Sequence, residues 1–339
     1  MATLAQIAAE ASVSEATVSR VLNGKPGVSE GTRTAVLMAL DVLGYERPVK
    51  LRQRSAGLVG LVVPELVNPI FPAFAQVIED ALARRRFTPV LCTQSPGGIS
   101  EDEYVESLLD HGVAGIIFVS GRHSDTSADH DRYRALVTRG LPVVFVNGYA
   151  ENLAAPFFSA DDRDAMELAV SHLTQLGHTR IGLAIGPARF VPSARKREGF
   201  ITAMVRTLGL DPAEAQGWIQ EGLFSVEGGA AAARKLLERG ATAVVCGSDL
   251  MALGAVREAR ERGGSVPADV SVIGFDDSPL IQFLDPPLTT IRQPVGAIGA
   301  AAVAALADAI DGVPVPAHEY VYKPELVLRG STGPAPTAG

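Results

Sequence analysis

Apolar residues follow two different patterns along the chain, and the pattern changes near residue 57. Before that point they recur every three or four positions, which is the spacing of one helical face. They form three such stretches, residues 4–11, 15–22 and 30–44. Thr3, Ser14 and Ser29 each precede one stretch, and their side-chain oxygens can accept hydrogen bonds from the free N–H groups of a first helical turn. The sequence therefore predicts three capped helices.

The second predicted helix is short and has two unlike faces. Val18, Val21 and Leu22 lie on one side, which is enough to pack it against the first helix across a short turn. The opposite face lacks an apolar partner and holds Glu15, Ala16, Ser19, Arg20 and Asn23. Two short helices joined by such a turn form a helix-turn-helix, whose second helix enters the DNA major groove. We interpret this face as a DNA-reading surface; the alternative is a small helical cap on the following domain.

From Leu58 onward, apolar runs of strand length alternate with helical stretches. The runs are LVGLVVPE, TPVLCTQ, VAGIIFVS, LPVVFVN, RIGLAIGP, AVVCGS and VSVIGFDD. Continuous Val, Ile and Leu are typical of parallel strands that are buried on both faces. The length of the chain fits two doubly wound halves, with the change between them near residues 159–161.

These patterns predict a small all-α head and an α/β core of two doubly wound parallel-sheet subdomains. The expected boundaries are 1–46 for the helix-turn-helix domain, 47–57 for a hinge or linker, 58–158 with 290–320 for the N-terminal core subdomain, 159–289 with 321–332 for the C-terminal core subdomain, and 333–339 for a disordered tail. Ligands of open α/β sheets bind beyond the carboxyl ends of the strands, where the topology switches. We therefore expect a binding site at the strand ends.

Polar residues end several of the predicted strands. Asp276 directly follows one, so its carboxylate is free to bind two neighbouring hydroxyls of a sugar. The alternative is the capping of a following helix, which Asp277 or Ser278 would supply equally well. Asn147, Ser248 and Asp249 end other runs and are further candidate partners for ligand hydroxyls.

Charge is distributed unevenly along the chain. Residues 1–56 hold seven Lys and Arg against five Asp and Glu, whereas the whole chain carries a net charge of −8. Four of those seven cations lie in RPVKLRQR, residues 47–54, without an acidic residue among them. A basic head on an acidic body indicates a nucleic-acid-binding module, although such a cluster is also typical of a solvated linker.

Several classes of protein are disfavoured. No apolar run approaches the roughly 20 residues that a membrane helix needs, and the N-terminus lacks the pattern of a secretory signal. Cys92 and Cys246 lie in apolar runs, which predicts buried reduced thiols and a cytoplasmic protein. The chain has no G-x-S-x-G elbow, P-loop or H-E-x-x-H, so we expect no enzyme and no cofactor.

The segment RHSDTSADHDRY, residues 122–133, gathers residue types that bind metals. These are His123, Asp125, Asp129, His130 and Asp131. A surface loop has the same composition without a metal, and we favour that interpretation, so no metal site is predicted.

The first 45 residues, with ATVSRVLN followed by the spaced VS, TR and LGY, closely resemble the DNA-binding head of the lactose-repressor (LacI/GalR) family of bacterial transcription regulators. The resemblance continues through GLVVPELVNPIFP to VIGFDDSPL and PPLTTIRQP, and so covers essentially the whole chain. It implies a homodimer or tetramer that binds palindromic operators, responds to a small ligand that is most often a sugar, and has a core similar to periplasmic sugar-binding proteins.

The resemblance also implies that the two positions after Ser14, which are Glu15 and Ala16, select bases. Together with the exposed face of the second helix, this gives the predicted DNA contacts: Thr3, Ser14, Glu15, Ala16, Thr17, Ser19, Arg20, Asn23, Tyr45, Leu51 and Arg52. The linker departs from the family, since Pro48 comes three residues after Tyr45 and the usual Ala-Arg pair is missing. Leu51 is the only leucine placed to wedge into the minor groove; the alternative is an electrostatic role for the linker cations.

Further ligand contacts follow from the same resemblance. Phe71 and Phe224 match family positions whose rings flank the ligand. The family commonly has an arginine three residues before the glycine of SARKREGF; Lys196 holds that position, and Arg195 beside it is the alternative. The predicted effector site comprises Phe71, Asn147, Arg195, Lys196, Phe224, Ser248, Asp249 and Asp276.

The predicted function is a sequence-specific repressor of carbohydrate-use genes. It acts as a homodimer on a double-stranded, pseudo-palindromic operator, and a small sugar controls its DNA affinity. A purine or protein co-effector is the first alternative, but the RFVPSA loop is apolar where purine-responding relatives carry polar contacts. A solute-binding protein is the second, and both the helical head and the missing signal sequence count against it.

Overall fold

The computed structural model describes residues 3–23, 25–44, 55–94 and 97–336. The chain divides into two compact units, Met1–Ala56 and Gly57–Gly339. The linker residues Tyr45, Leu51 and Arg52, for which DNA contacts are expected, lie outside the described residues.

The first unit contains the three predicted helices, α1 (Leu4–Glu10), α2 (Glu15–Leu22) and α3 (Glu30–Val42). The predicted caps are confirmed: Thr3 and Gln6 form a capping box, and Ser14 and Ser29 each accept a backbone N–H. Ile7, Val18 and Leu40 lie in a small core that the three helices share. The third helix ends before the predicted Gly44, because Gly44 has a left-handed φ of 62°.

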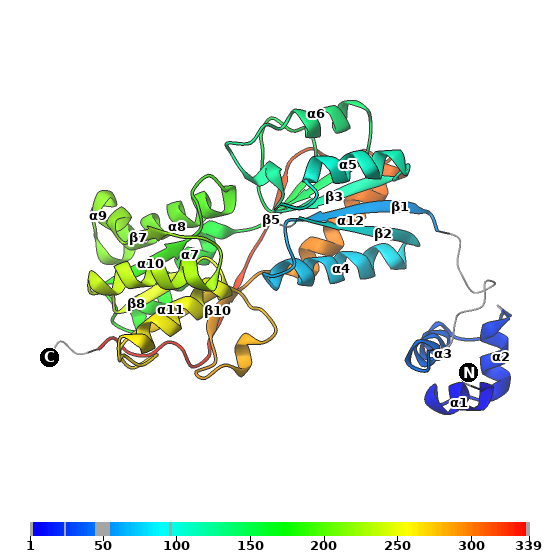
Figure 1. Cartoon of the computed structure of the whole chain (residues 1–339), viewed down its shortest axis with the longest axis horizontal. Helices are drawn as coiled ribbons and strands as arrows, with labels where there is room; N and C mark the ends of the chain where they lie inside the picture. Colours follow the sequence, from blue (N-terminus) through cyan, green and yellow to red (C-terminus); the bar gives the residue numbers. More distant parts are fainter. Residues whose placement is uncertain (1–2, 24, 45–54, 95–96, 337–339) are drawn as a thin grey trace. The chain divides into compact units, whose positions relative to one another are not determined.

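The N-terminal half of the core is a parallel sheet with strand order β11-β5-β4-β3-β1-β2. Its strands are β1 (Gly57–Val63), β2 (Phe87–Thr93), β3 (Gly115–Val119), β4 (Val143–Val146), β5 (Phe157–Ala160) and β11 (Glu319–Tyr322). One face is covered by α4 (Ile70–Arg84) and α12 (Val295–Ile310), and the other by α5 (Glu101–Asp110) and α6 (Asp131–Thr138) (Figure 1). A short 3-10 helix, η2 (Arg122–Ser124), follows β3.

The C-terminal half repeats this arrangement with strand order β12-β10-β9-β8-β6-β7. Its strands are β6 (Ile181–Ile185), β7 (Ile219–Glu221), β8 (Ala243–Cys246), β9 (Ser271–Asp276), β10 (Thr289–Arg292) and β12 (Glu325–Val327). Only β12 among these described strands pairs antiparallel. Its helices are α7 (Asp162–Gln175), α8 (Val191–Leu208), α9 (Pro212–Gly217), α10 (Val226–Glu238), α11 (Asp249–Glu261) and the 3-10 helix η3 (Ile281–Phe283). Figure 1 shows α7 and α8 on one side of the sheet and α10 and α11 on the other. The predicted fold class is thus confirmed.

The chain crosses between the two sheets after Ala160, Arg292 and Tyr322. The sequence places these crossings after residues 158, 289 and 320, which is too early in each case. The strands extend further along the chain than the apolar runs indicate, because their last residues still pair within the sheet: Ala160 pairs with Tyr322, and Arg292 pairs with Asp276.

The tail is ordered further than predicted. The backbone N–H of Gly333 donates to Ser271 Oγ at 3.0 Å, and that of Ala335 donates to Leu176 O at 2.8 Å. The prediction that disorder begins at residue 333 is therefore wrong for residues 333–336, because hydrogen bonds to the C-terminal subdomain fix this segment. Residues 337–339 lie outside the described structure.

Cys92 and Cys246 are both buried and free, as the sequence predicted. None of the helices among the described residues is both long enough and apolar enough to span a bilayer.

Candidate DNA-binding surface and effector cavity

The polar face of α2 is open to solvent. Glu15, Ala16, Arg20 and Asn23 are exposed, whereas Val18 on the opposite face is fully buried. The helix therefore keeps its apolar stripe for the head and presents the predicted DNA-reading side chains outward.

Part of the predicted DNA surface also holds the head together. Ser14 Oγ accepts the backbone N–H of Thr17 at 3.2 Å and lies 2.9 Å from the Thr17 hydroxyl. Thr3 and Gln6 bond to each other, and Asn23 Nδ2 donates to Ser19 O at 2.8 Å. These polar groups fix the ends of α1 and α2, so that they present a preformed surface.

A cavity of about 460 Å³ lies in the second unit, where the carboxyl ends of strands from both sheets meet. This volume is within the range of small-molecule sites. Six predicted residues line it: Phe71, Asn147, Lys196, Phe224, Ser248 and Asp276. The sequence did not single out the other lining residues as individual ligand contacts. These other residues are Pro64, Glu65, Asn68, Ile70, Gln94, Ser120, Ser124, Asp162, Phe190, Pro192, Gly247, Phe275 and Gln293.

Two predicted effector residues do not line this cavity. Arg195 donates two hydrogen bonds to the Glu319 carboxylate, at 2.6 and 2.8 Å, and so joins α8 to β11 instead. Asp249 accepts from Ser278 N and from Thr290 Oγ1, both at 2.7 Å, and its side chain is almost wholly buried. Both predictions are corrected: these side chains have structural partners. Of the two cations that the sequence left open, Lys196 is the one in the lining.

Asp276 lies at the end of β9 in an unusual backbone conformation. Its φ is 119° and that of Asp277 is 60°, both in the region that favours glycine. Asp277 holds this bend, because its carboxylate accepts from Arg292 Nε and Arg329 Nη2, each at 2.6 Å. Asp276 lines the cavity, and its carboxylate accepts a hydrogen bond from Gln293 Nε2 at 2.7 Å. The alternative, that Asp276 caps a helix, does not apply, since η3 has no side-chain cap.

The electrostatics of this side of the cavity follow from burial. Removal from water raises the pKa of Asp276 well above its usual value, and the nearby Asp249 carboxylate raises it further. The hydrogen bond from Gln293 acts in the opposite direction and lowers this pKa. Burial also raises the pKa of Asp249, to about 6. Among the described residues, Gln293 is the one hydrogen-bond donor to the Asp276 carboxylate, so further donors in the cavity would stabilise its charged form.

Lys196 and Asp162 form a buried ion pair at the same end. Lys196 Nζ lies 2.5 Å from Asp162 Oδ1 and 3.8 Å from the centre of the Phe275 ring. Burial raises the pKa of Asp162, although the neighbouring ammonium opposes the shift. Asp162 begins α7 directly after the crossing from β5; its position at the predicted topological switch was the signal that could have identified it.

Aromatic rings form the apolar wall. The centres of Phe190 and Phe224 are 6.3 Å apart, and both rings line the cavity together with Phe71. Phe224 packs over Gly186 so closely that a Cβ there would come within 2.1 Å of the ring. Gly186 therefore makes room for Phe224, which gives the cavity a flat apolar surface beside its charged end.

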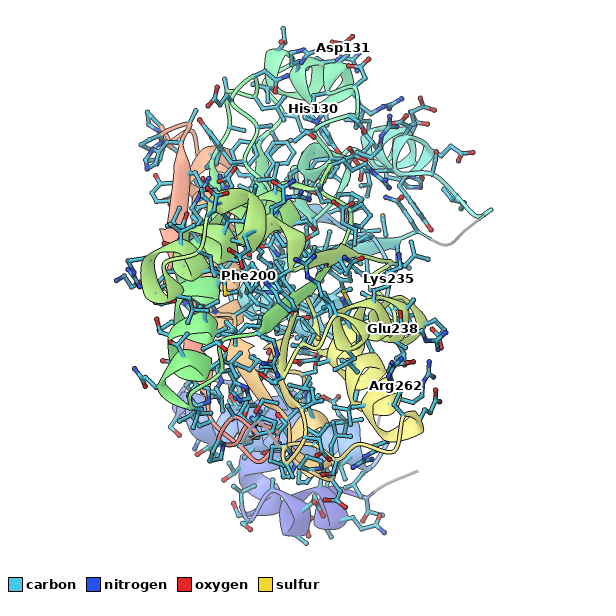
Figure 2. All side chains as sticks on the ribbon, turned by 90° about the vertical axis from the view of Figure 1, so that its left-hand side faces the viewer. His130, Asp131, Phe200, Lys235, Glu238 and Arg262 are labelled. Atoms are coloured by element: carbon cyan, nitrogen blue, oxygen red, sulfur yellow. The ribbon has the colours of Figure 1, made fainter. Side chains whose placement is uncertain are left out.

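The 122–133 segment does not form a metal cluster. His123 is buried. His130 and Asp131 lie at the start of α6, and Figure 2 shows them at a distance from Lys235 and Glu238 of α10. No group of three or more His, Cys, Asp or Glu among the described residues could hold a metal ion. Asp125 instead pairs with Arg189 at 2.9 Å.

A helix-turn-helix head followed by a two-sheet α/β core with a ligand-sized cavity defines a class of DNA-binding regulators. Comparison with known families agrees. Residues 3–47 match the model of the bacterial regulatory proteins of the lacI family, and residues 170–332 match that of the periplasmic binding protein-like domain.

Relatives match almost the full length of the chain. The HTH-type transcriptional regulator MalR of Streptomyces coelicolor is 63% identical over 334 residues, which is 98% of this chain and 97% of MalR. A complex of the transcriptional regulator CelR with cellobiose has a TM-score of 0.71 and 31% identity, covering 98% of this chain and all of that one. A lac repressor dimer bound to operator and an anti-inducer has a TM-score of 0.69 and 27% identity, covering 98% and 99%. The chain belongs to the LacI family of bacterial regulatory proteins, and it is a DNA-binding transcriptional regulator rather than an enzyme.

Proposed function

We propose that the protein is a homodimeric repressor of carbohydrate-use genes whose affinity for a pseudo-palindromic operator is controlled by a small sugar in the cavity. The observation that carries this proposal is the composition of the cavity wall. A buried carboxylate, a buried ammonium, neutral amides and aromatic rings line one cavity.

This wall is complementary to a carbohydrate. A sugar hydroxyl both donates and accepts hydrogen bonds, so it can donate to the Asp276 carboxylate and accept from the Lys196 ammonium. The amide of Asn147 can do either. The C–H faces of a sugar ring are apolar, and the rings of Phe190 and Phe224 offer the matching surface.

The position of the cavity supports control of DNA binding. A ligand shifts a conformational equilibrium only by as much as it prefers one state over the other. A sugar that contacts Phe71 and Asn147 in one subdomain and Lys196 and Asp276 in the other prefers one relative arrangement of the two subdomains. The CelR structure contains cellobiose, and the lac repressor structure is a dimer on operator DNA, which supports the two halves of the proposal.

A thermal denaturation series tests the ligand class. The probes are glucose, ribose, maltose, cellobiose and lactose, with hypoxanthine and adenosine to represent the purine alternative. A sugar at a hundred times its Kd stabilises the native state by about 2.7 kcal/mol, which raises the Tm by several degrees. A purine that raises the Tm while every sugar leaves it unchanged would contradict the proposal.

A further inference from the structure

The 122–133 segment supplies little of the cavity wall, and several of its residues form a chain of buried hydrogen bonds. The Tyr133 hydroxyl donates to Glu101 Oε1, and Tyr133 in turn accepts the backbone N–H of His123 at 3.1 Å. Glu101 Oε2 accepts from Gln94 Nε2 and from Arg122 N, both at 3.2 Å. Glu101 is only 2% exposed, so this carboxylate has exchanged water for these donors.

His123 continues the chain to the next strand end. Its Nε2 lies 3.1 Å from Asn147 O and 3.3 Å from Val146 O. Both partners are carbonyl oxygens, so Nε2 carries the proton and donates. Burial lowers the pKa of His123 to about 3, which keeps the ring neutral and the direction of this bond fixed. The ring also packs against Phe145, with centres 4.8 Å apart.

Both ends of the chain are residues of the cavity wall. Gln94 and Asn147 line the cavity, and each has its amide N–H₂ engaged, Gln94 with Glu101 and Asn147 with Ser120 Oγ at 3.2 Å. The amide oxygens of both side chains have no hydrogen-bond partner among the described residues, and so they are available as acceptors. Asn147 also has a left-handed φ of 58°, a conformation that asparagine adopts more readily than most other residues.

We propose that Glu101, Tyr133 and His123 are positioning residues of the effector site, which hold Gln94 and Asn147 so that their amide oxygens accept hydrogen bonds from ligand hydroxyls. The inference rests on the proposed function and deepens it. Burial of the Glu101 carboxylate is costly, since apolar residues of similar volume would fill a core without this desolvation cost. Its hydrogen bonds lead to the cavity wall, directly to Gln94 and through Tyr133 and His123 to Asn147.

The test removes one hydroxyl. In Tyr133→Phe, Glu101 Oε1 and the His123 N–H both lose their partner, while the ring and its packing remain. Tyr149→Phe is the matched control, since Tyr149 lies in the same subdomain, packs against Phe157, and its hydroxyl bonds to none of the described residues. With the same five sugars as probes, Tyr133→Phe should weaken binding of the stabilising sugar about threefold to tenfold. Tyr149→Phe should leave it unchanged.

A double-mutant cycle separates positioning from general destabilisation. If Tyr133 acts through the cavity amides, Tyr133→Phe has much less effect on sugar affinity once Gln94→Ala and Asn147→Ala are present. Equal losses in the two backgrounds, or a Tyr133→Phe variant that binds like the wild type, would overturn the inference and leave the proposed function intact. A wild-type protein that none of the sugars stabilises overturns the proposed function, and the inference with it.

Discussion

Gln293 Nε2 donates a 2.7 Å hydrogen bond to Asp276 Oδ1. Gln293 directly follows β10, at the point where the chain leaves the C-terminal sheet for α12 of the N-terminal subdomain. Asp276 therefore connects the cavity to a segment that joins the two subdomains. A ligand that binds this carboxylate competes with Gln293 or shares the carboxylate with it, and either change acts on the crossing segment itself.

The first prediction concerns Asp276→Ala. We expect operator affinity within about twofold of the wild type, because the head is a separate folded unit. The response of DNA binding to sugar should be lost, since this substitution removes the carboxylate that we propose as a ligand contact. Electrophoretic mobility shifts with and without sugar measure both quantities, and Asp110→Ala, an exposed position on α5, is the control. A variant that responds at the usual sugar concentration would remove Asp276 from the site.

The second prediction is a dependence of sugar affinity on pH. The pKa of Asp276 is raised by burial and by Asp249, so its carboxyl takes up a proton on acidification well before an exposed aspartate does. The protonated form is a weaker acceptor, and sugar affinity should therefore fall as the pH is lowered through this raised pKa. Calorimetric titration from pH 8 to pH 5 checks this. In Asp276→Asn the dependence should be much smaller; an identical pH profile in the variant would exclude Asp276 as the titrating group.

The third prediction concerns the stability of the core. Lys196→Met leaves the buried Asp162 carboxylate without its partner, which should lower the free energy of unfolding by about 3 kcal/mol or more. Arg197→Ala is the matched control on the same helix, since its pair with Glu221 is partly exposed and should contribute less than about 1 kcal/mol. Urea denaturation measures both. Equal losses would mean that the Lys196–Asp162 pair is not isolated from water.

The sequence predicted the elements because their patterns are local. The caps at Ser14 and Ser29 and the parallel apolar runs depend on neighbouring residues and on burial on both faces. Side-chain partners from distant parts of the chain could not be predicted from the sequence in the same way. Arg195 and Lys196 are adjacent in sequence, yet one meets Glu319 of β11 and the other meets Asp162 of α7, as the register of α8 dictates.

The fourth prediction concerns Arg20, which is exposed on the last turn of α2. An arginine can donate two hydrogen bonds to guanine, which contributes about 1–3 kcal/mol of discrimination. Arg20→Ala should therefore weaken binding to the operator sharply and binding to scrambled DNA much less. Arg52→Ala in the linker is the comparison, and it should weaken both duplexes alike and lower the salt slope by about one. If Arg20→Ala weakened both duplexes equally, the arginine would contact phosphate instead of a base.

The fifth prediction concerns Glu15, the first residue of α2. Its carboxylate can accept a hydrogen bond from a cytosine amino group but is repelled by phosphates. Glu15→Gln should change the preferred base at one position in each half-site, because an amide both donates and accepts. Selection from a random DNA pool with each protein reads this directly, and an unchanged consensus would show that Glu15 does not contact a base.

The central claim is that a sugar in the cavity controls operator affinity. The most direct measurement is the fluorescence anisotropy of a labelled operator duplex, titrated with the wild-type protein and with Asp276→Ala, with and without a saturating amount of the sugar that raises the Tm. The account predicts that the sugar changes the Kd of the wild type for operator about tenfold or more and leaves that of Asp276→Ala unchanged. A wild-type protein that binds the sugar, as its Tm shows, yet keeps the same operator Kd would contradict it.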